Sequence, residues 1–252
     1  MSKPKIAFFD FTSCEGCQIE FTNFGAPAFV ELLNHVEVVE FREAMSEKTT
    51  EPIDIALIEG SFTREADRAR LEEIRKRAKI VIAYGQCAST GGINALKNHQ
   101  TDYQDFVYGQ DAQMPHLASA RALPISAVIK VDYCAYGCPV NKYEVLQILS
   151  HLLHGKGPVI PNYPVCFECK RRETVCRYAE GDHCMGQVAR AGCSAPCPAA
   201  GIPCEVCRGF VDHPNIGALE KVLRERAGFS EQRAREKARM FTANQLGSTP
   251  CR

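Results

Sequence analysis

The feature that most constrains this chain is a group of eight cysteines within 42 residues of its C-terminal half. Their spacing is C-x2-C-x6-C-x7-C, then C-x3-C-x6-C-x2-C, at Cys166, Cys169, Cys176, Cys184, Cys193, Cys197, Cys204 and Cys207. Proline and glycine are frequent here and large apolar residues are scattered, so the segment cannot bury enough apolar area to offset its ordering entropy. Its order must come from disulfides or from metal that the thiols hold.

Metal is the better interpretation, because nothing in the sequence predicts export. The first residues, MSKPKIAFFDF, lack the apolar core of a signal peptide, and no run of about 18 apolar residues is present to span a membrane. We therefore expect a cytoplasmic protein, in which thiols stay reduced and cysteine clusters favour metal. The 30 basic and 30 acidic residues balance, which gives no electrostatic reason to expect a nucleic-acid partner.

The first half of the chain alternates short apolar runs with helical patterns. Runs rich in isoleucine, valine and phenylalanine are typical of strands buried on both faces of a parallel sheet. The predicted strands are 5–11, 36–41, 53–60, 79–85 and 127–133, and the predicted helices are 19–34, interrupted at Gly25 and Pro27, 63–78 and 141–155. This order predicts an α/β fold with a doubly wound parallel sheet. Two charged helices are predicted over 217–242, with Ser230 as an N-cap between them.

Four further cysteines follow the carboxyl ends of predicted strands. Cys14 and Cys17 follow the first strand, Cys87 the fourth and Cys138 the fifth. Ligands of open α/β sheets bind outside these ends, so three separate loops are expected to bring four thiols to one place. The glycines around Cys87 would let backbone approach a bulky group there.

Four thiols plus eight suggest three sites of four thiolates each. Zinc is one possibility, because the first and last pairs of the eight cysteines are spaced like zinc-ribbon knuckles. Four more cysteines lie between those pairs, however, and a site built from three loops at a sheet edge suits an iron–sulfur cubane better than zinc. Iron–sulfur clusters are therefore the favoured interpretation, with zinc as the alternative.

The motifs TSCEGCQ, YGQCASTGG and YGCPV, followed by a cysteine-rich segment ending in PCEVCRG, resemble the small, electron-transferring subunit of [NiFe] hydrogenases. YPVCFEC, CMGQVARAGCSAPCP and KARMF are most similar to the cytosolic bidirectional branch, whose small (delta) subunit belongs to NADP-linked hydrogenase or sulfhydrogenase complexes. The resemblance covers about residues 3–242. It implies a flavodoxin-like domain over 1–157 and, after a proline-rich linker, an irregular iron–sulfur domain with helices over 158–252.

The resemblance also implies three [4Fe–4S] clusters. The proximal cluster is assigned to Cys14, Cys17, Cys87 and Cys138, the distal cluster to Cys166, Cys169, Cys176 and Cys184, and the medial cluster to Cys193, Cys197, Cys204 and Cys207. Cys166 replaces a histidine of membrane-bound and periplasmic relatives, and Cys197 fills a corner that those relatives leave without a cysteine. The grouping of the eight stays open from the residues alone, because clusters can exchange their fourth ligands. Cys134 and Cys251 are expected outside the three sets.

The implied function is electron transfer between the nickel–iron site of a large subunit and the flavin- and iron–sulfur-bearing subunits of an NAD(P) reductase. No catalytic residue, nickel, flavin or NAD(P) is expected in this chain, which should not split hydrogen alone. One alternative is the small subunit of a coenzyme F420- or heterodisulfide reductase-linked hydrogenase. Others are a complex I-like quinone oxidoreductase subunit, whose first motif usually has adjacent cysteines, and a zinc protein without a redox role.

Overall fold

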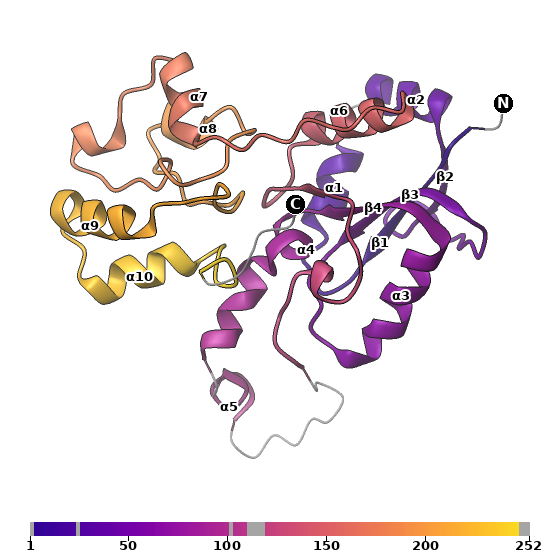
Figure 1. Cartoon of the computed structure of the whole chain (residues 1–252), viewed down its shortest axis with the longest axis horizontal. Coiled ribbons are helices and arrows are strands. Elements are labelled where there is room, and N and C mark those ends of the chain that lie inside the picture. Colours follow the sequence, from indigo (N-terminus) through magenta and orange to yellow (C-terminus); the bar gives the residue numbers. More distant parts are fainter. Residues whose placement is uncertain (1–2, 24–25, 101–102, 110–118, 247–252) are drawn as a thin grey trace.

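The computed structural model describes residues 3–23, 26–100, 103–109 and 119–246. A parallel sheet with its helices forms one part, and the segment with the eight cysteines, together with two helices, forms a second part beside it (Figure 1). Nowhere in the described ranges is there a helix long and apolar enough to cross a membrane.

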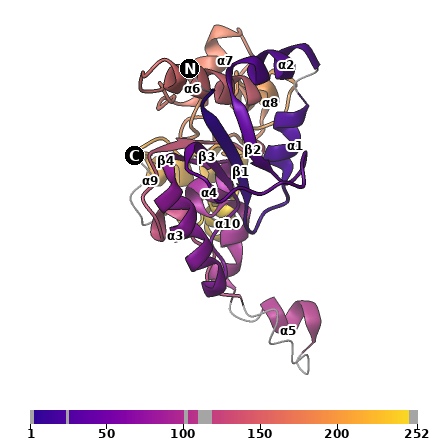
Figure 2. The same ribbon diagram turned by 90° about the vertical axis from the view of Figure 1, so that its right-hand side faces the viewer.

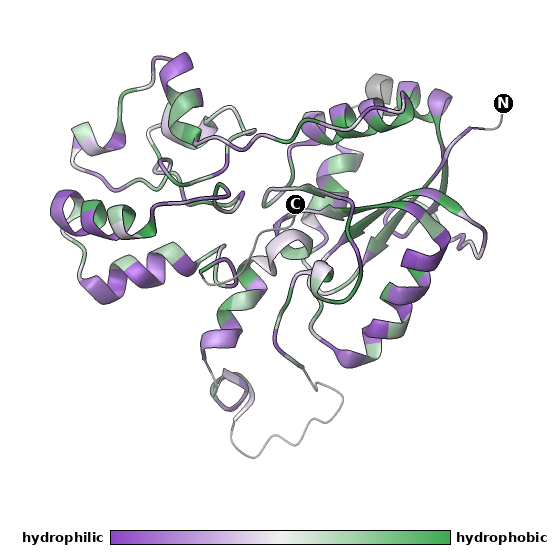
Figure 3. Ribbon diagram, in the orientation of Figure 1, coloured by the Kyte–Doolittle hydropathy of each residue, from purple (hydrophilic) through white to green (hydrophobic). Residues whose placement is uncertain are grey.

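The sheet has five strands, all parallel, in the order β2-β1-β3-β4-β5. Its strands are β1 (Lys5–Asp10), β2 (Glu37–Phe41), β3 (Ile53–Glu59), β4 (Ala78–Tyr84) and β5 (Tyr133–Ala135). This is the flavodoxin-like order, in which the direction of winding reverses between β1 and β3. The predicted α/β class and parallel sheet are confirmed, and the strands are the most continuous apolar elements of the chain (Figure 3).

Helices cover both faces of the sheet. They are α1 (Gly16–Thr22), α2 (Ala26–His35), α3 (Arg68–Arg77), α4 (Gln86–Thr90) and α6 (Lys142–Leu153), with 3-10 turns at η1 (Glu65–Asp67), η2 (Gly92–His99) and η4 (Ile125–Ala127). A further helix, α5 (Tyr103–Tyr108), buries no residue and stands away from the sheet (Figure 2). Successive residues of β1 point to opposite faces: Ala7 and Phe9 pack in a core with α3 and α4, whereas Ile6 and Phe8 pack in a core with α1 and α6. The sheet is therefore wound on both faces, as predicted.

The structure departs from the predicted elements in two places. The predicted fifth strand, 127–133, is wrong, because β5 begins only at Tyr133. The apolar residues before it, among them Val128 and Ile129, pack against the core without joining the ladder, and the Asp132 carboxylate accepts the Val81 backbone N–H at 2.8 Å. The second departure lies between β4 and β5, where α4, η2 and η4 were not predicted. Gly25, one of the two predicted helix breakers, lies outside the described residues.

The cysteine-rich part has a small core of its own. Its elements are α7 (Val165–Arg171), η5 (Arg177–Glu180), α8 (Pro196–Ala199), α9 (Ile216–Ala227) and α10 (Glu231–Arg239). Buried residues from α7, the cysteine loops, α9 and α10 form one cluster, to which the helices contribute chiefly small and aliphatic side chains such as Leu219, Leu223 and Ala234. Ser230 caps α10 as predicted, since its hydroxyl accepts the Arg233 backbone N–H. Helices α9 and α10 thus pack along one side of the cysteine loops (Figure 1).

The residues after α10 return to the sheet and tie the two parts together. The Asn244 side chain donates to the carbonyl oxygens of Thr90 and Ala122, both at 2.9 Å. Gln245 accepts the backbone N–H of Phe210 at 3.0 Å. Figure 1 shows the chain after α10 turning toward α4, and in the view of Figure 2 α10 lies behind α4.

Candidate functional site

The loops after β1, β4 and β5 bring together the four cysteines of the predicted proximal set. Cys17 lies on α1, Cys87 on α4, and Cys14 and Cys138 on the loops after β1 and β5. Burial raises the pKa of Cys17, Cys87 and Cys138 most, and the other thiols of the set add to it because they lie nearby: Cys87 and Cys138 act on Cys17, and Cys14 acts on Cys87 and Cys138. The convergence expected from the strand ends is therefore observed, at the winding reversal of the sheet.

Backbone without side chains surrounds the sulfur atoms of the proximal set. A Cβ atom at Gly85 would lie 2.5 Å from Cys17 Sγ, and one at Gly92 would lie 2.9 Å from Cys87 Sγ. Gly16 stands in the same relation to Cys14, at 3.3 Å. The three glycines leave room beside the sulfur atoms of Cys14, Cys17 and Cys87. This space fits a bulky inorganic group bonded to all four thiolates.

Glu59, at the end of β3, fixes the first cysteine loop. Its buried carboxylate accepts the backbone N–H of Cys17 at 3.1 Å and that of Gln18 at 3.0 Å, which anchors the first turn of α1. Burial raises the pKa of Glu59 despite these bonds. Burial also raises the pKa of Cys17, and the neighbouring Glu59, Cys87 and Cys138 raise it further. A cluster of thiolates in this place therefore requires a positively charged core, which iron or another metal would supply.

Replacing Gly85 by alanine tests whether the space beside Cys17 is needed. The new Cβ would meet Cys17 Sγ at 2.5 Å, at a backbone φ of +90° that disfavours side chains. We expect G85A to lower the iron bound at the proximal site by at least about half, since one ligand must shift. The matched control is Gly155→Ala, which has a φ of +67° and no atom within 4 Å of the new Cβ. Equal iron content in the two variants would contradict the expectation.

The predicted distal set lines a single cavity. All four of its cysteines, together with Lys170, Val175 and Tyr178, face a cavity of about 120 Å³. Burial, together with Cys184, Cys169 and Cys176, raises the pKa of Cys166 to about 11. A Cβ atom at Gly186 would lie 3.5 Å from the sulfur atoms of both Cys166 and Cys184, so a glycine is placed beside this set as well. We call this space the distal cavity.

The predicted medial set gathers between the other two. Burial raises the pKa of Cys193 to about 11, to which the neighbouring Cys207 contributes. Burial likewise raises the pKa of Cys204, with contributions from the distal Cys184 and from Cys207 and Cys193. Cys197 raises the pKa of Cys207, which completes the set of four. Cys193, Cys197, Cys204 and Cys207 are neighbours, but Cys204 also contacts the distal Cys184, so the division of the eight cysteines into two sets stays a prediction.

Direct contacts join the three sets in the order proximal, medial, distal. Burial raises the pKa of the medial Cys207, the backbone N–H of the proximal Cys138 lowers it, and the Cys138 thiol raises it, so the two residues are neighbours. The backbone N–H of the medial Cys204 donates to Sγ of the distal Cys184 at 3.4 Å. No group of three or more His, Cys, Asp or Glu side chains in the described ranges surrounds a single ion position. A cubane, in contrast, binds each of its four thiolates at a different iron.

Arg208 links the medial set to the sheet. Its guanidinium, 3% exposed, pairs with the Glu144 carboxylate of α6 at 2.6 Å. It also donates to the Tyr136 carbonyl oxygen at 2.6 Å and to the Ala191 carbonyl oxygen at 2.8 Å. Its positive charge lowers the pKa of Cys193 and of Cys207. One side chain therefore fastens the two parts of the molecule together and places a cation beside the medial thiols.

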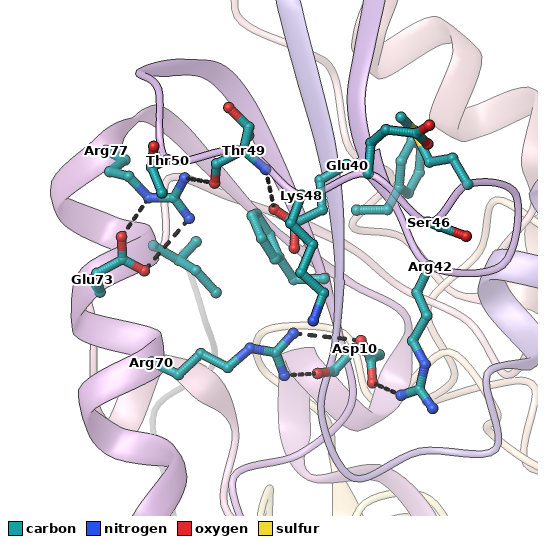
Figure 4. Close-up of a pocket in the computed structure, with 15 residues that line it drawn as sticks. Asp10, Glu40, Arg42, Ser46, Lys48, Thr49, Thr50, Arg70, Glu73 and Arg77 are labelled. Carbon is teal, nitrogen blue, oxygen red and sulfur yellow. Dashed lines mark hydrogen bonds and ion pairs between the residues drawn. The ribbon is translucent and has the colours of Figure 1, made fainter.

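A larger cavity, of about 580 Å³, lies near the carboxyl end of β1, between α3 and the loop after β2 (Figure 4). Its guanidinium groups are already paired with carboxylates of the same cavity: Arg42 with Asp10 at 2.5 Å and Arg77 with Glu73 at 2.7 Å. No cysteine is among the described residues that line it. This cavity is therefore separate from the thiol sets.

Sequence reasoning found the cysteines but missed the residues that hold them in place. Glu59 was visible as a charge at the end of the apolar run IDIALIEG, and Arg208 as the residue after the last of the eight cysteines. Asn94, whose side chain donates to the Thr12 carbonyl oxygen at 2.9 Å, gave no such signal. Cys134 is buried in the sheet core, away from the assigned sets, and Cys251 lies outside the described residues.

Comparison with known proteins agrees with this arrangement. A family described as NADH ubiquinone oxidoreductase, 20 Kd subunit, matches residues 14–152, more than half of the chain. The chain is 34% identical to sulfhydrogenase 2 subunit delta of Pyrococcus furiosus over 88% of its own length and 92% of that protein. It is 33% identical to a subunit of the F420-non-reducing hydrogenase vhu of Methanocaldococcus jannaschii, over 82% of each chain.

Solved structures give the same result for the fold. A chain of an NAD+-reducing [NiFe]-hydrogenase in the H2-reduced state matches with a TM-score of 0.56 and 28% identity, over 63% of this chain and 96% of that one. A chain of the actinobacterial-type NiFe-hydrogenase from Ralstonia eutropha H16 matches 99% of this chain with a TM-score of 0.61; at 15% identity it supports the fold alone. The chain therefore belongs to the family of [NiFe] hydrogenase small subunits and is an oxidoreductase subunit of that kind.

Proposed function

We propose that this chain relays single electrons through three [4Fe–4S] clusters between the nickel–iron site of its large subunit and an NAD(P) reductase module. The proximal, medial and distal sets would each hold one cluster. The observation that carries the proposal is the chain of contacts from Cys138 to Cys207 and from Cys204 to Cys184, which makes the three sets successive neighbours. The proposed domains are 1–157, with the proximal set, and 158–252, with the other two.

The residues around the thiols fit iron–sulfur clusters in their chemistry. When bound, such clusters supply reversible one-electron transfer, with potentials set by burial, net charge and hydrogen bonds to sulfur. Backbone hydrogen bonds at Val140 and Ala195 lower the pKa of Cys17 and of Cys193, respectively. Arg208 adds a cation beside the medial set, whereas Glu59 adds a carboxyl group beside the proximal set. These opposite charges favour reduction at the medial site over the proximal one.

The electron acceptor of the relay is carried by other subunits of the complex. The likeness to an NAD+-reducing hydrogenase supports a nicotinamide-linked module. A coenzyme F420-linked complex is less favoured, because two relatives named as F420-non-reducing match 82% and 83% of this chain, whereas a coenzyme F420 hydrogenase subunit gamma matches 60%. Purification of the tagged chain from its host, with identification of the subunits that remain bound, separates these acceptors.

Metal analysis tests the cluster assignment directly. We expect the anaerobically purified protein to contain about twelve iron atoms and about twelve acid-labile sulfides per chain, four of each for every set. Iron chelation under oxidising conditions should remove both together with the visible absorbance. About two or three zinc ions per chain, with no labile sulfide, would show instead that the thiols bind single ions.

A further inference from the structure

The distal cavity opens on a surface that combines exposed apolar and cationic side chains. Cys176 is exposed, Val175 beside it is 60% exposed, and Phe167 on α7 is 53% exposed. Lys170, which lines the cavity, and Arg171 are both exposed and lie at the C-terminal end of α7. Figure 3 shows this end of α7 as hydrophilic, at the edge of the molecule away from the sheet.

The cations of this surface outnumber its acidic side chains: in the run 170–173, three exposed cations stand beside one exposed carboxylate, that of Glu173. Glu168, the acidic residue of α7, is turned inward, where its carboxylate accepts the backbone N–H groups of Gly192 at 2.8 Å and Ala195 at 3.2 Å. Arg172 follows α7 and donates only to a backbone carbonyl oxygen, that of Ser194. The chain as a whole has a formal net charge of zero, so this excess of cations is a property of the surface and not of the protein.

We propose that this surface, formed by Phe167, Lys170, Arg171, Arg172 and Val175, docks the acidic face of an electron-transfer protein. The inference rests on the proposed function, because it takes the distal set as the outer end of the relay. Apolar side chains at the centre of such a contact would exclude water, and the cations around them would steer an acidic partner toward the distal cavity. A second copy of this chain would present the same cations and would be repelled.

Electron transfer to two probe proteins of opposite charge tests the inference. The complex of the chain with its large subunit is reduced with dithionite and mixed with cytochrome b5, an acidic one-electron acceptor, or with cytochrome c, a basic one. We expect the acidic probe to be reduced faster at low ionic strength, and this advantage to fall as salt is added. In the K170E/R171E variant the acidic probe should react at least about tenfold more slowly and the basic probe faster.

The matched control is R224E/R226E, which reverses two exposed cations on α9 that do not line the distal cavity. It should leave both rates within about twofold of the unchanged complex. Equal effects of the two double variants, or no difference between the probes, would overturn the docking inference. Loss of iron or of the cluster spectra in the unchanged complex would instead count against the proposed function, so the two failures are distinguishable.

Discussion

Replacing Arg208 by glutamine is expected to lower the free energy of unfolding by about 3–5 kcal/mol, because it leaves the Glu144 carboxylate buried without its partner. Both side chains of the pair are less than a tenth exposed, at 3% and 8%. The substitution also removes hydrogen bonds to Tyr136 and Ala191 that join the two parts of the molecule. Thermal unfolding of the metal-loaded protein should show a midpoint lower by roughly 10 °C.

Two further variants identify the cause of this loss. In R208Q/E144Q no uncompensated charge remains, so part of the stability should return, and the difference from the sum of the single variants gives the coupling energy. Lys221→Gln breaks an exposed pair with Glu225 at 3.9 Å and should change the stability by less than about 0.5 kcal/mol. A loss below about 1 kcal/mol in R208Q would mean that the buried pair does not hold the two parts together.

Removing one cysteine from each of two sets should convert two clusters independently. Cys176 and Cys197 are both exposed, so alanine at either position leaves the hydrophobic core unchanged. We expect C176A to hold a three-iron cluster at the distal site and C197A to hold one at the medial site, each with its own paramagnetic signal. The double variant should show both signals and retain about ten iron atoms per chain.

This experiment also tests whether Cys176 and Cys197 belong to different clusters, as the proposed grouping requires. If Cys176 and Cys197 belonged to one cluster, the double variant would have only two thiolates left there, and that cluster would be lost with a fall to about eight iron atoms. Ser194→Ala, an exposed change in the loop just before α8, which carries Cys197, controls for disturbance of the backbone. If the double variant showed only one of the two three-iron signals, the proposed grouping would be rejected.

Much of the fold was predictable because the strands are apolar and short, and each is bounded by turn residues. Four of the five predicted strands agree with the structure within about one residue at each end. The fifth failed because apolarity alone does not distinguish a strand from a segment that packs on the core without ladder bonds, as Val128 and Ile129 do. The segment that pairs with β4 is decided by hydrogen bonds across the sheet, such as that from the Val81 backbone N–H to the Asp132 carboxylate.

The candidate site was predictable in its thiols and not in their surroundings. The strand ends predicted the convergence of the four proximal cysteines, and the density of the other eight predicted further metal sites. The division of those eight into two sets came from the family resemblance and stays a prediction. Glu59 and Arg208 act through partners 42 and 64 residues away, at Cys17 and Glu144, and no local pattern encodes such pairs. The orientation of the Glu168 carboxylate, on which the charge of the distal surface depends, likewise follows only from the folded structure.

The way the chain supplies its ligands has a consequence for assembly. The proximal cysteines are spread from Cys14 to Cys138 and meet only when β1, β4 and β5 have joined the same sheet. The distal and medial cysteines lie within 42 consecutive residues, so their loops close at a much smaller entropic cost. On the proposed assignment, we expect the C-terminal sites to bind metal while the protein is still largely unfolded, and the proximal site to fill only after the long-range sheet contacts form.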